Sequence, residues 1–117
     1  MTGPTNFRRW SLAALRHKRA ALVRQLPPLT AILRGSLIER YKRCGNPNCR
    51  CTQGPGHGPK LYLSVSVSGG RPVMHYVPAG YHEQVSEYLD NYRQSRQLLE
   101  EICEVNLELL RRREELG

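Results

Sequence analysis

The last third of the chain has the clearest helical periodicity, since neither proline nor glycine occurs between Tyr81 and Gly117. With Val85 as heptad position a, the a and d positions are Val85, Tyr88, Tyr92, Ser95, Leu99, Ile102, Asn106 and Leu109. Six of these eight are apolar or aromatic, which predicts a helix of about thirty residues with one packing face. Asparagine at an a position is typical of dimeric coiled coils, so a homodimer is weighed against packing within the chain.

The segment before this helix alternates with the period of a β-strand. Its apolar residues occupy every second position: Leu61, Leu63, Val65 and Val67. The positions between them are Tyr62, Ser64, Ser66 and Ser68. A glycine pair and a second alternating run, Val73–Val77, follow, which predicts a hairpin with one apolar core face and one polar face. The alternation over residues 37–42 predicts a further strand.

Residues 7–26 are mostly good helix formers, and the pair Pro27 and Pro28 predicts where that helix stops. Its leucines, Leu12, Leu15, Leu22 and Leu26, fall on one side, with Arg19 interrupting them. The sequence therefore predicts an α+β fold with a three-stranded antiparallel sheet, a basic N-terminal helix and a long C-terminal helix. We expect three segments: 1–30 with the basic helix, 31–80 with the sheet and its loop, and 81–117 with the long helix.

Charge is distributed unevenly along the 117 residues. Residues 1–60 carry twelve Lys and Arg against one acid, net +11, whereas residues 61–117 carry six against nine, net −3, giving +8 in total. An excess of this size points to a polyanionic partner. No run of about 18 apolar residues and no secretory signal occurs, so we expect a cytoplasmic protein without a membrane partner.

A short loop, RCGNPNCRCTQGPGHGPK, holds three of the four cysteines. Cys44, Cys49, Cys51 and His57 have the spacing C-x4-C-x-C-x5-H, and a Cys3His set is typical of structural zinc. In a reducing compartment such a cluster indicates metal more than a disulfide. We therefore expect a structural Zn²⁺ on these four residues, with His75 as the alternative fourth ligand and a thiol-redox site as the alternative chemistry.

Basic residues near this loop and in the first helix are candidates for phosphate contacts. The predicted nucleic-acid-binding residues are Arg8, Arg9, Arg16, Lys18, Arg19, Arg40, Lys42, Arg43, Arg50, Lys60 and Tyr62. No H-E-x-x-H motif, no phosphate-binding glycine loop and no convincing pair of acids occurs, so we expect neither an enzyme nor a small-molecule substrate.

The stretches GSLIERYKRCGNPNCRC, HGP, YLS and YVP, followed by a long Glu/Leu/Arg-rich helix, resemble a family of small Cys-rich bacterial proteins often encoded near transposase genes. The resemblance covers residues 35–113 and is most specific over 43–64. It implies a mobile-element setting and metal ligands at Cys44, Cys49, Cys51 and His57, but no activity. Relatives tend to have a run of tyrosines where this chain has KLYLS, so any stacking role there rests on Tyr62.

Two hypotheses follow. The first is a zinc-stabilised nucleic-acid-binding module, associated with DNA, mobile elements and the nucleoid. The order of three strands and a helix resembles the arm-type DNA-binding domains of tyrosine recombinases in architecture. The second is an interaction adaptor whose long C-terminal helix docks a partner protein.

Overall fold

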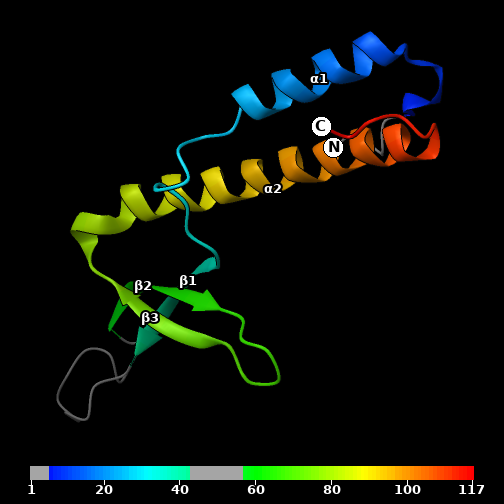
Figure 1. Cartoon of the computed structure of the whole chain (residues 1–117). Coiled ribbons are helices and arrows are strands. Elements are labelled where there is room, and N and C mark those ends of the chain that lie inside the picture. Colours follow the sequence, from blue (N-terminus) through cyan, green and yellow to red (C-terminus); the bar gives the residue numbers. More distant parts are fainter. Residues whose placement is uncertain (1–5, 43–56) are drawn as a thin grey trace, which may run out of the picture. The chain divides into compact units, whose positions relative to one another are not determined.

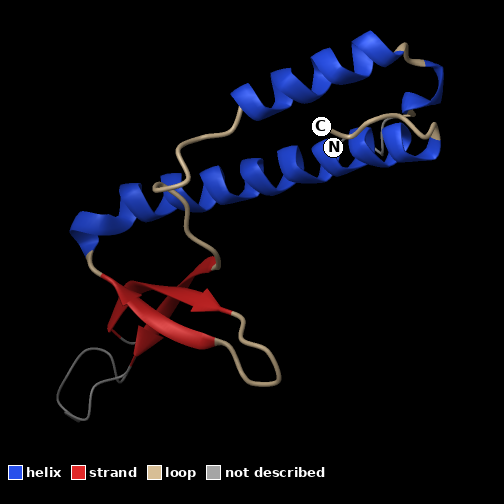
Figure 2. Cartoon of the chain, viewed as in Figure 1, coloured by secondary structure: helices blue, strands red, loops and turns tan. Residues whose placement is uncertain are grey.

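The computed structural model describes residues 6–42 and 57–117 and has an α+β architecture, which confirms the predicted fold class. Its helices are α1 (Leu12–Arg24) and α2 (His82–Arg111), and two short 3-10 helices, η1 (Phe7–Arg9) and η3 (Ala79–Tyr81), precede them (Figure 1). The strands are β1 (Ser36–Lys42), β2 (His57–Val65) and β3 (Val73–Val77). They form one antiparallel sheet in the order β1-β2-β3 (Figure 2). The zinc site that we expected to staple this sheet involves residues outside the described ranges.

The chain divides into two compact units. Unit 1 combines the described residues up to Ala31 with Asn91–Gly117, and unit 2 is Ile32–Asp90. Helix α2 therefore contributes its first turns to unit 2 and the remainder to unit 1. The segments expected from the sequence follow chain order, whereas the units group residues from both ends of the chain.

Unit 1 is a helical hairpin in which α1 lies antiparallel to the second part of α2 (Figure 1). The Oγ atom of Ser11 accepts a hydrogen bond from the Ala14 N–H at 3.0 Å, which caps the first turn of α1. The helix ends before the two prolines, as predicted. Its core consists of Phe7, Leu15, Leu22, Leu98, Val105 and Leu109. The leucine stripe predicted from the sequence is thus the buried face of α1.

The heptad face of α2 is occupied within the chain. Ile102 and Leu109 pack into the core shared with α1, and Oδ1 of Asn106 accepts a hydrogen bond from Nη1 of Arg19 at 2.7 Å. Leu99, also expected on this face, is instead exposed. Packing within the chain, the alternative weighed against a homodimer, therefore supplies the facing helix of this seam and a partner for the polar asparagine, while the homodimer stays a prediction.

Unit 2 buries one face of the sheet against the start of α2. Its core is Leu63, Val77 and Leu89, with Leu33, Leu37, Leu61, Val65 and Val85 packed around it. The backbone N–H of Leu33 donates to the Tyr88 carbonyl at 3.1 Å, which ties the segment before β1 to α2. The alternation of Leu61, Leu63 and Val65 is therefore the core face, as predicted.

The hairpin differs from the prediction at its tip. Strand β2 ends at Val65, and Val67, which we expected in the core, is exposed. Seven residues, 66–72, connect the strands, with Gly69 at a φ of 72°. Strand β2 thus ends two residues before the alternating pattern in the sequence, which continues to Val67. Across the described residues, no helix is long and apolar enough to cross a membrane.

Candidate functional site

The sheet of unit 2 has one face that does not contribute to the core cluster. Successive side chains of a strand point to opposite faces, so the register of the three strands assigns this second face directly. It carries Ser36, Ile38 and Arg40 from β1, Lys60, Tyr62 and Ser64 from β2, and Met74 and Tyr76 from β3. We call these eight residues the open face.

Two cations stand opposite each other at one end of the open face. Arg40 pairs with Lys60 in the register of β1 and β2, and both side chains are exposed. Directly opposed residues have Cβ atoms about 5 Å apart, and like charges at such positions destabilise a sheet. The fold thus keeps an electrostatically unfavourable pair where an anion would relieve it.

Aromatic residues lie beside these cations. Tyr62 pairs with Tyr76 across β2 and β3, and their ring centroids are 5.7 Å apart at an interplanar angle of 63°. The Nζ atom of Lys60 lies 6.0 Å from the centroid of the Tyr76 ring, at the outer limit of a cation–π contact. Tyr76 nevertheless remains 55% exposed. The result is a surface that combines positive charge with exposed aromatic area.

None of the eight open-face residues is acidic. Glu39 is the only acid among the described residues of the three strands, and its register position opposite Leu61 places it on the core-side face. Anions approaching the open face therefore meet no opposing carboxylate from the strands themselves.

Tyr76 was missed by the sequence reasoning, which assigned stacking in this region to Tyr62 alone. The alternation in the sequence could have identified it. Tyr76 alternates with Val73, His75 and Val77, so its side chain lies on the sheet face opposite to that of Val77. The pairing of Tyr76 with Tyr62 depends on the strand register, which the alternation of residues within each strand does not specify.

The structure separates the predicted nucleic-acid-binding residues into groups. Arg40, Lys60 and Tyr62 are brought together on the open face. Lys42 and His57 pair in the register of β1 and β2 at the end of the strands next to the loop. Arg43, Arg50, Cys44, Cys49 and Cys51 lie outside the described residues.

The basic residues of the first helix belong to unit 1, and two of them are engaged within it. Nη2 of Arg16 donates to the Glu115 carbonyl at 3.1 Å, and Nη1 of Arg19 donates to the Leu116 carbonyl as well as to Asn106. These two guanidinium groups hold the C-terminal segment against α1. Arg8 and Arg9 in η1 are exposed, and Lys18 on α1 is half-buried.

The metal-binding expectation is corrected for the part of the chain that the structure covers. No group of three or more His, Cys, Asp or Glu residues that could hold a metal ion occurs among residues 6–42 and 57–117. His75, the alternative ligand, therefore belongs to no metal-binding group there, and Cys103 is a free, exposed thiol on α2. The ligand set of Cys44, Cys49, Cys51 and His57 depends on residues outside these ranges and stays untested.

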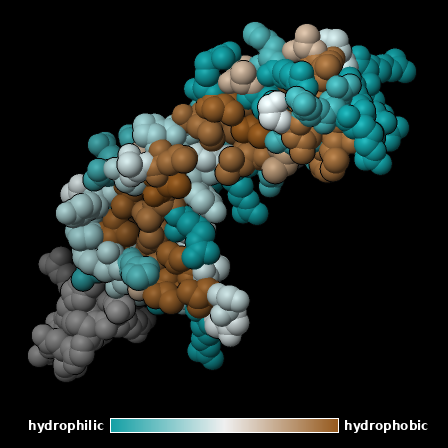
Figure 3. Space-filling view, in the orientation of Figure 1, coloured by the Kyte–Doolittle hydropathy of each residue, from teal (hydrophilic) through white to brown (hydrophobic). Residues whose placement is uncertain are grey.

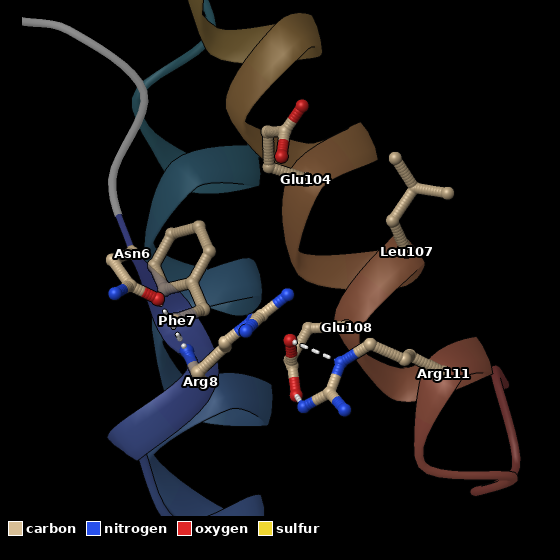
Figure 4. A pocket seen from close by; sticks show the side chains of 7 residues that line it. All are labelled: Asn6, Phe7, Arg8, Glu104, Leu107, Glu108 and Arg111. Carbon is tan, nitrogen blue, oxygen red and sulfur yellow. Dashed lines mark hydrogen bonds and ion pairs between the residues drawn. The ribbon is translucent and has the colours of Figure 1, made fainter.

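Unit 1 contains a cavity of about 240 Å³ lined by Asn6, Phe7, Arg8, Glu104, Leu107, Glu108 and Arg111 (Figure 4). The carboxylate of Glu108 accepts hydrogen bonds from Arg111 and from Nε of Arg112, the latter at 2.7 Å. The Arg111 hydrogen bond, followed by that of Arg112, lowers the pKa of Glu108 from 4.5 to about 2.

This ion-pair cluster joins the two ends of unit 1. Nη2 of Arg112 donates to the carbonyls of Phe7 and Arg8 at 3.1 and 3.0 Å. Glu108 therefore orients Arg112, which in turn holds η1 against the end of α2. Since Glu108 is already paired with two guanidinium groups, this cavity is accounted for by the packing of unit 1, and the open face is the stronger candidate site.

Comparison with known proteins places the described elements in one family. Residues 12–87 match the model of a family described as a domain of unknown function, DUF6788. The matched stretch includes α1, all three strands and the first turns of α2, and so contains every residue of the open face. No curated protein and no solved structure matches the chain.

Proposed function

We propose that this chain, which belongs to the DUF6788 family, is a nucleic-acid-binding module that acts through the open face of its sheet. The observation that carries the proposal is the juxtaposition of Arg40 and Lys60 with Tyr62 and Tyr76 on a face without acids. This combination suits a ligand that carries both negative charge and flat aromatic groups.

Electrostatics favours the same ligand. Binding of phosphates to lysine and arginine releases condensed counterions, which supplies a salt-dependent driving force. The +8 net charge of the chain adds a long-range attraction for any polyanion. Apposed cations, which repel each other in the free protein, gain most when a phosphate lies between them.

The resemblance of the loop motif to bacterial proteins encoded near transposases gives this proposal its setting. We place the module in the bacterial cytoplasm, associated with the DNA of mobile elements and thus with the nucleoid. It is proposed as a binding module and not as an enzyme, and it needs no membrane or small-molecule substrate.

Titration of labelled DNA at several salt concentrations tests the proposal. Wild-type protein should lose affinity steeply as salt rises, and the double variant Arg40→Ala/Lys60→Ala should reduce the slope of log K against log salt by up to about 2. Arg71→Ala is the matched control, because Arg71 is an exposed cation in the β2–β3 connection and not on the open face.

An affinity that is independent of salt, or a loss in Arg71→Ala equal to that from one open-face substitution, would contradict the proposal. Circular dichroism of each variant verifies that the sheet remains folded, so that a loss of affinity is not a loss of structure.

A second candidate function is that of an interaction adaptor. It is favoured by three leucines on α2, Leu99, Leu107 and Leu110, which are each about half exposed. Figure 3 shows hydrophobic side chains at the surface of the helical region among hydrophilic ones. On this hypothesis, Leu99→Lys/Leu110→Lys abolishes binding of a partner protein, while the Arg40→Ala/Lys60→Ala variant retains it.

A further inference from the structure

We infer that the open face takes single-stranded nucleic acid, with an unpaired base stacked on Tyr76 and the adjoining phosphates held by Lys60 and Arg40. This inference rests on the proposed function and specifies its ligand. Three observations support it: the exposure of Tyr76, the apolar residues that flank Tyr76 on the sheet, and the position of Arg40 and Lys60.

The ring of Tyr76 is available for stacking. Its neighbour Tyr62 meets it edge to face and not face to face, so the two aromatic rings are not stacked upon each other. Tyr76 is 55% exposed, so a ligand that lies on the open face can reach its ring.

The register surrounds Tyr76 with apolar area. Ile38 and Tyr62 continue its row across the sheet, and Met74 precedes it by one alternation on the same strand. Ile38, Tyr62 and Met74 are all half-buried, so together they form a continuous platform and not isolated side chains. Such a platform fits the flat face of a base.

A duplex cannot use this platform in the same way. Within a duplex, each base has both faces covered by its neighbours and offers only its edges in the grooves. An unpaired base exposes its faces and stacks on aromatic side chains irrespective of sequence. The exposed ring therefore selects a single strand, whereas charge alone would not discriminate between the two forms.

The cations are placed to hold the backbone of such a strand. Lys60 precedes Tyr62 by two residues on β2, a distance of about 7 Å along the strand, and Arg40 lies opposite Lys60. Both cations thus form the row next to the aromatic row, beside Ile38 and Tyr62. Because the open face offers only these two cations, phosphate contacts alone give modest affinity, and stacking supplies the remainder.

Fluorescence anisotropy with the full chain tests this inference. The probes are a short labelled DNA strand of mixed sequence, the RNA strand of the same sequence and the DNA duplex. We expect either strand to bind at least about tenfold more tightly than the duplex. Tyr76→Leu, which keeps an apolar side chain but removes the ring, should weaken single-strand binding by about tenfold and leave duplex binding unchanged. Tyr76→Phe should retain wild-type affinity.

Tyr81→Ala provides the matched control, because Tyr81 is 57% exposed, lies in η3 and is not part of the open face. Equal losses in Tyr76→Leu and Tyr81→Ala would overturn the inference. Duplex binding as tight as strand binding, lost in Arg40→Ala/Lys60→Ala, would overturn the inference but leave the proposed function standing. No binding of any of the three probes at low salt would overturn both.

Discussion

Gly35 and Glu108 are the two residues whose identities the structure constrains most directly. Gly35 has a φ of +137°, and a Cβ there would lie 2.7 Å from the Ser64 carbonyl oxygen. Glu108 connects two arginines at the end of α2. Gly35 lets the start of β1 lie close to β2, and Glu108 positions Arg112 against η1. A conservative substitution tests each of these roles.

Gly35→Ala should lower the free energy of unfolding by about 1–3 kcal/mol, because alanine is strained at this φ and its Cβ meets backbone that cannot move aside. Urea denaturation measures this change. Gly80→Ala is the control, since no atom lies within 4 Å of a Cβ at Gly80. Equal stability of the two variants would show that β1 approaches β2 less closely than described.

Glu108 should contribute a pH-dependent part of the stability of unit 1. Its pKa is about 2 in the folded chain against 4.5 as the ordinary value, so the folded state favours the ionised form. The contribution is present above pH 4.5 and is lost as the pH falls from 4.5 to about 2. Denaturation at several pH values should therefore show a steeper loss for wild type than for Glu108→Gln.

Glu100→Gln is the control for this measurement, because Glu100 forms an exposed pair with Arg96 at 3.8 Å, and such surface pairs contribute little. If the Glu100→Gln and Glu108→Gln proteins lose stability identically over this pH range, Glu108 does not act as described.

Among the elements, α1 depends both on local sequence signals and on tertiary packing. The prolines Pro27 and Pro28 predicted its end, whereas its start at Leu12, capped by Ser11, lies five residues after the start expected from the sequence. A helix of 13 residues is marginal on its own, however, and is stabilised here by burying Leu15 and Leu22 against α2.

The cap of α1 can be tested separately from its packing. Ser11→Ala should lower the unfolding free energy by about 1 kcal/mol, because the Ala14 N–H loses its acceptor. Ser11→Asp should retain stability, since aspartate accepts the same hydrogen bond and its charge suits a helix N-terminus. Thermal denaturation followed by circular dichroism compares the three proteins, and equal midpoints for wild type and Ser11→Ala would rule out a stabilising cap.

At the scale of the whole molecule, the uneven charge of the sequence is divided between two units. The basic residues of the first half belong to α1 in unit 1 and to the strands in unit 2. Arg16 and Arg19 bind the C-terminal segment, whereas Arg40 and Lys60 face outward from the sheet.

The sequence by itself determined the type and approximate bounds of the elements, because periods of 2 and 3.6 residues, prolines and capping residues act locally. It thereby predicted the α+β class, the core face of β2 and the thirty residues of α2. Only the tertiary structure decided that α1 fills the seam of α2 and that Tyr76 lies beside Tyr62. Both depend on the pairing of residues far apart in the chain, which packing and strand register set and local patterns do not encode.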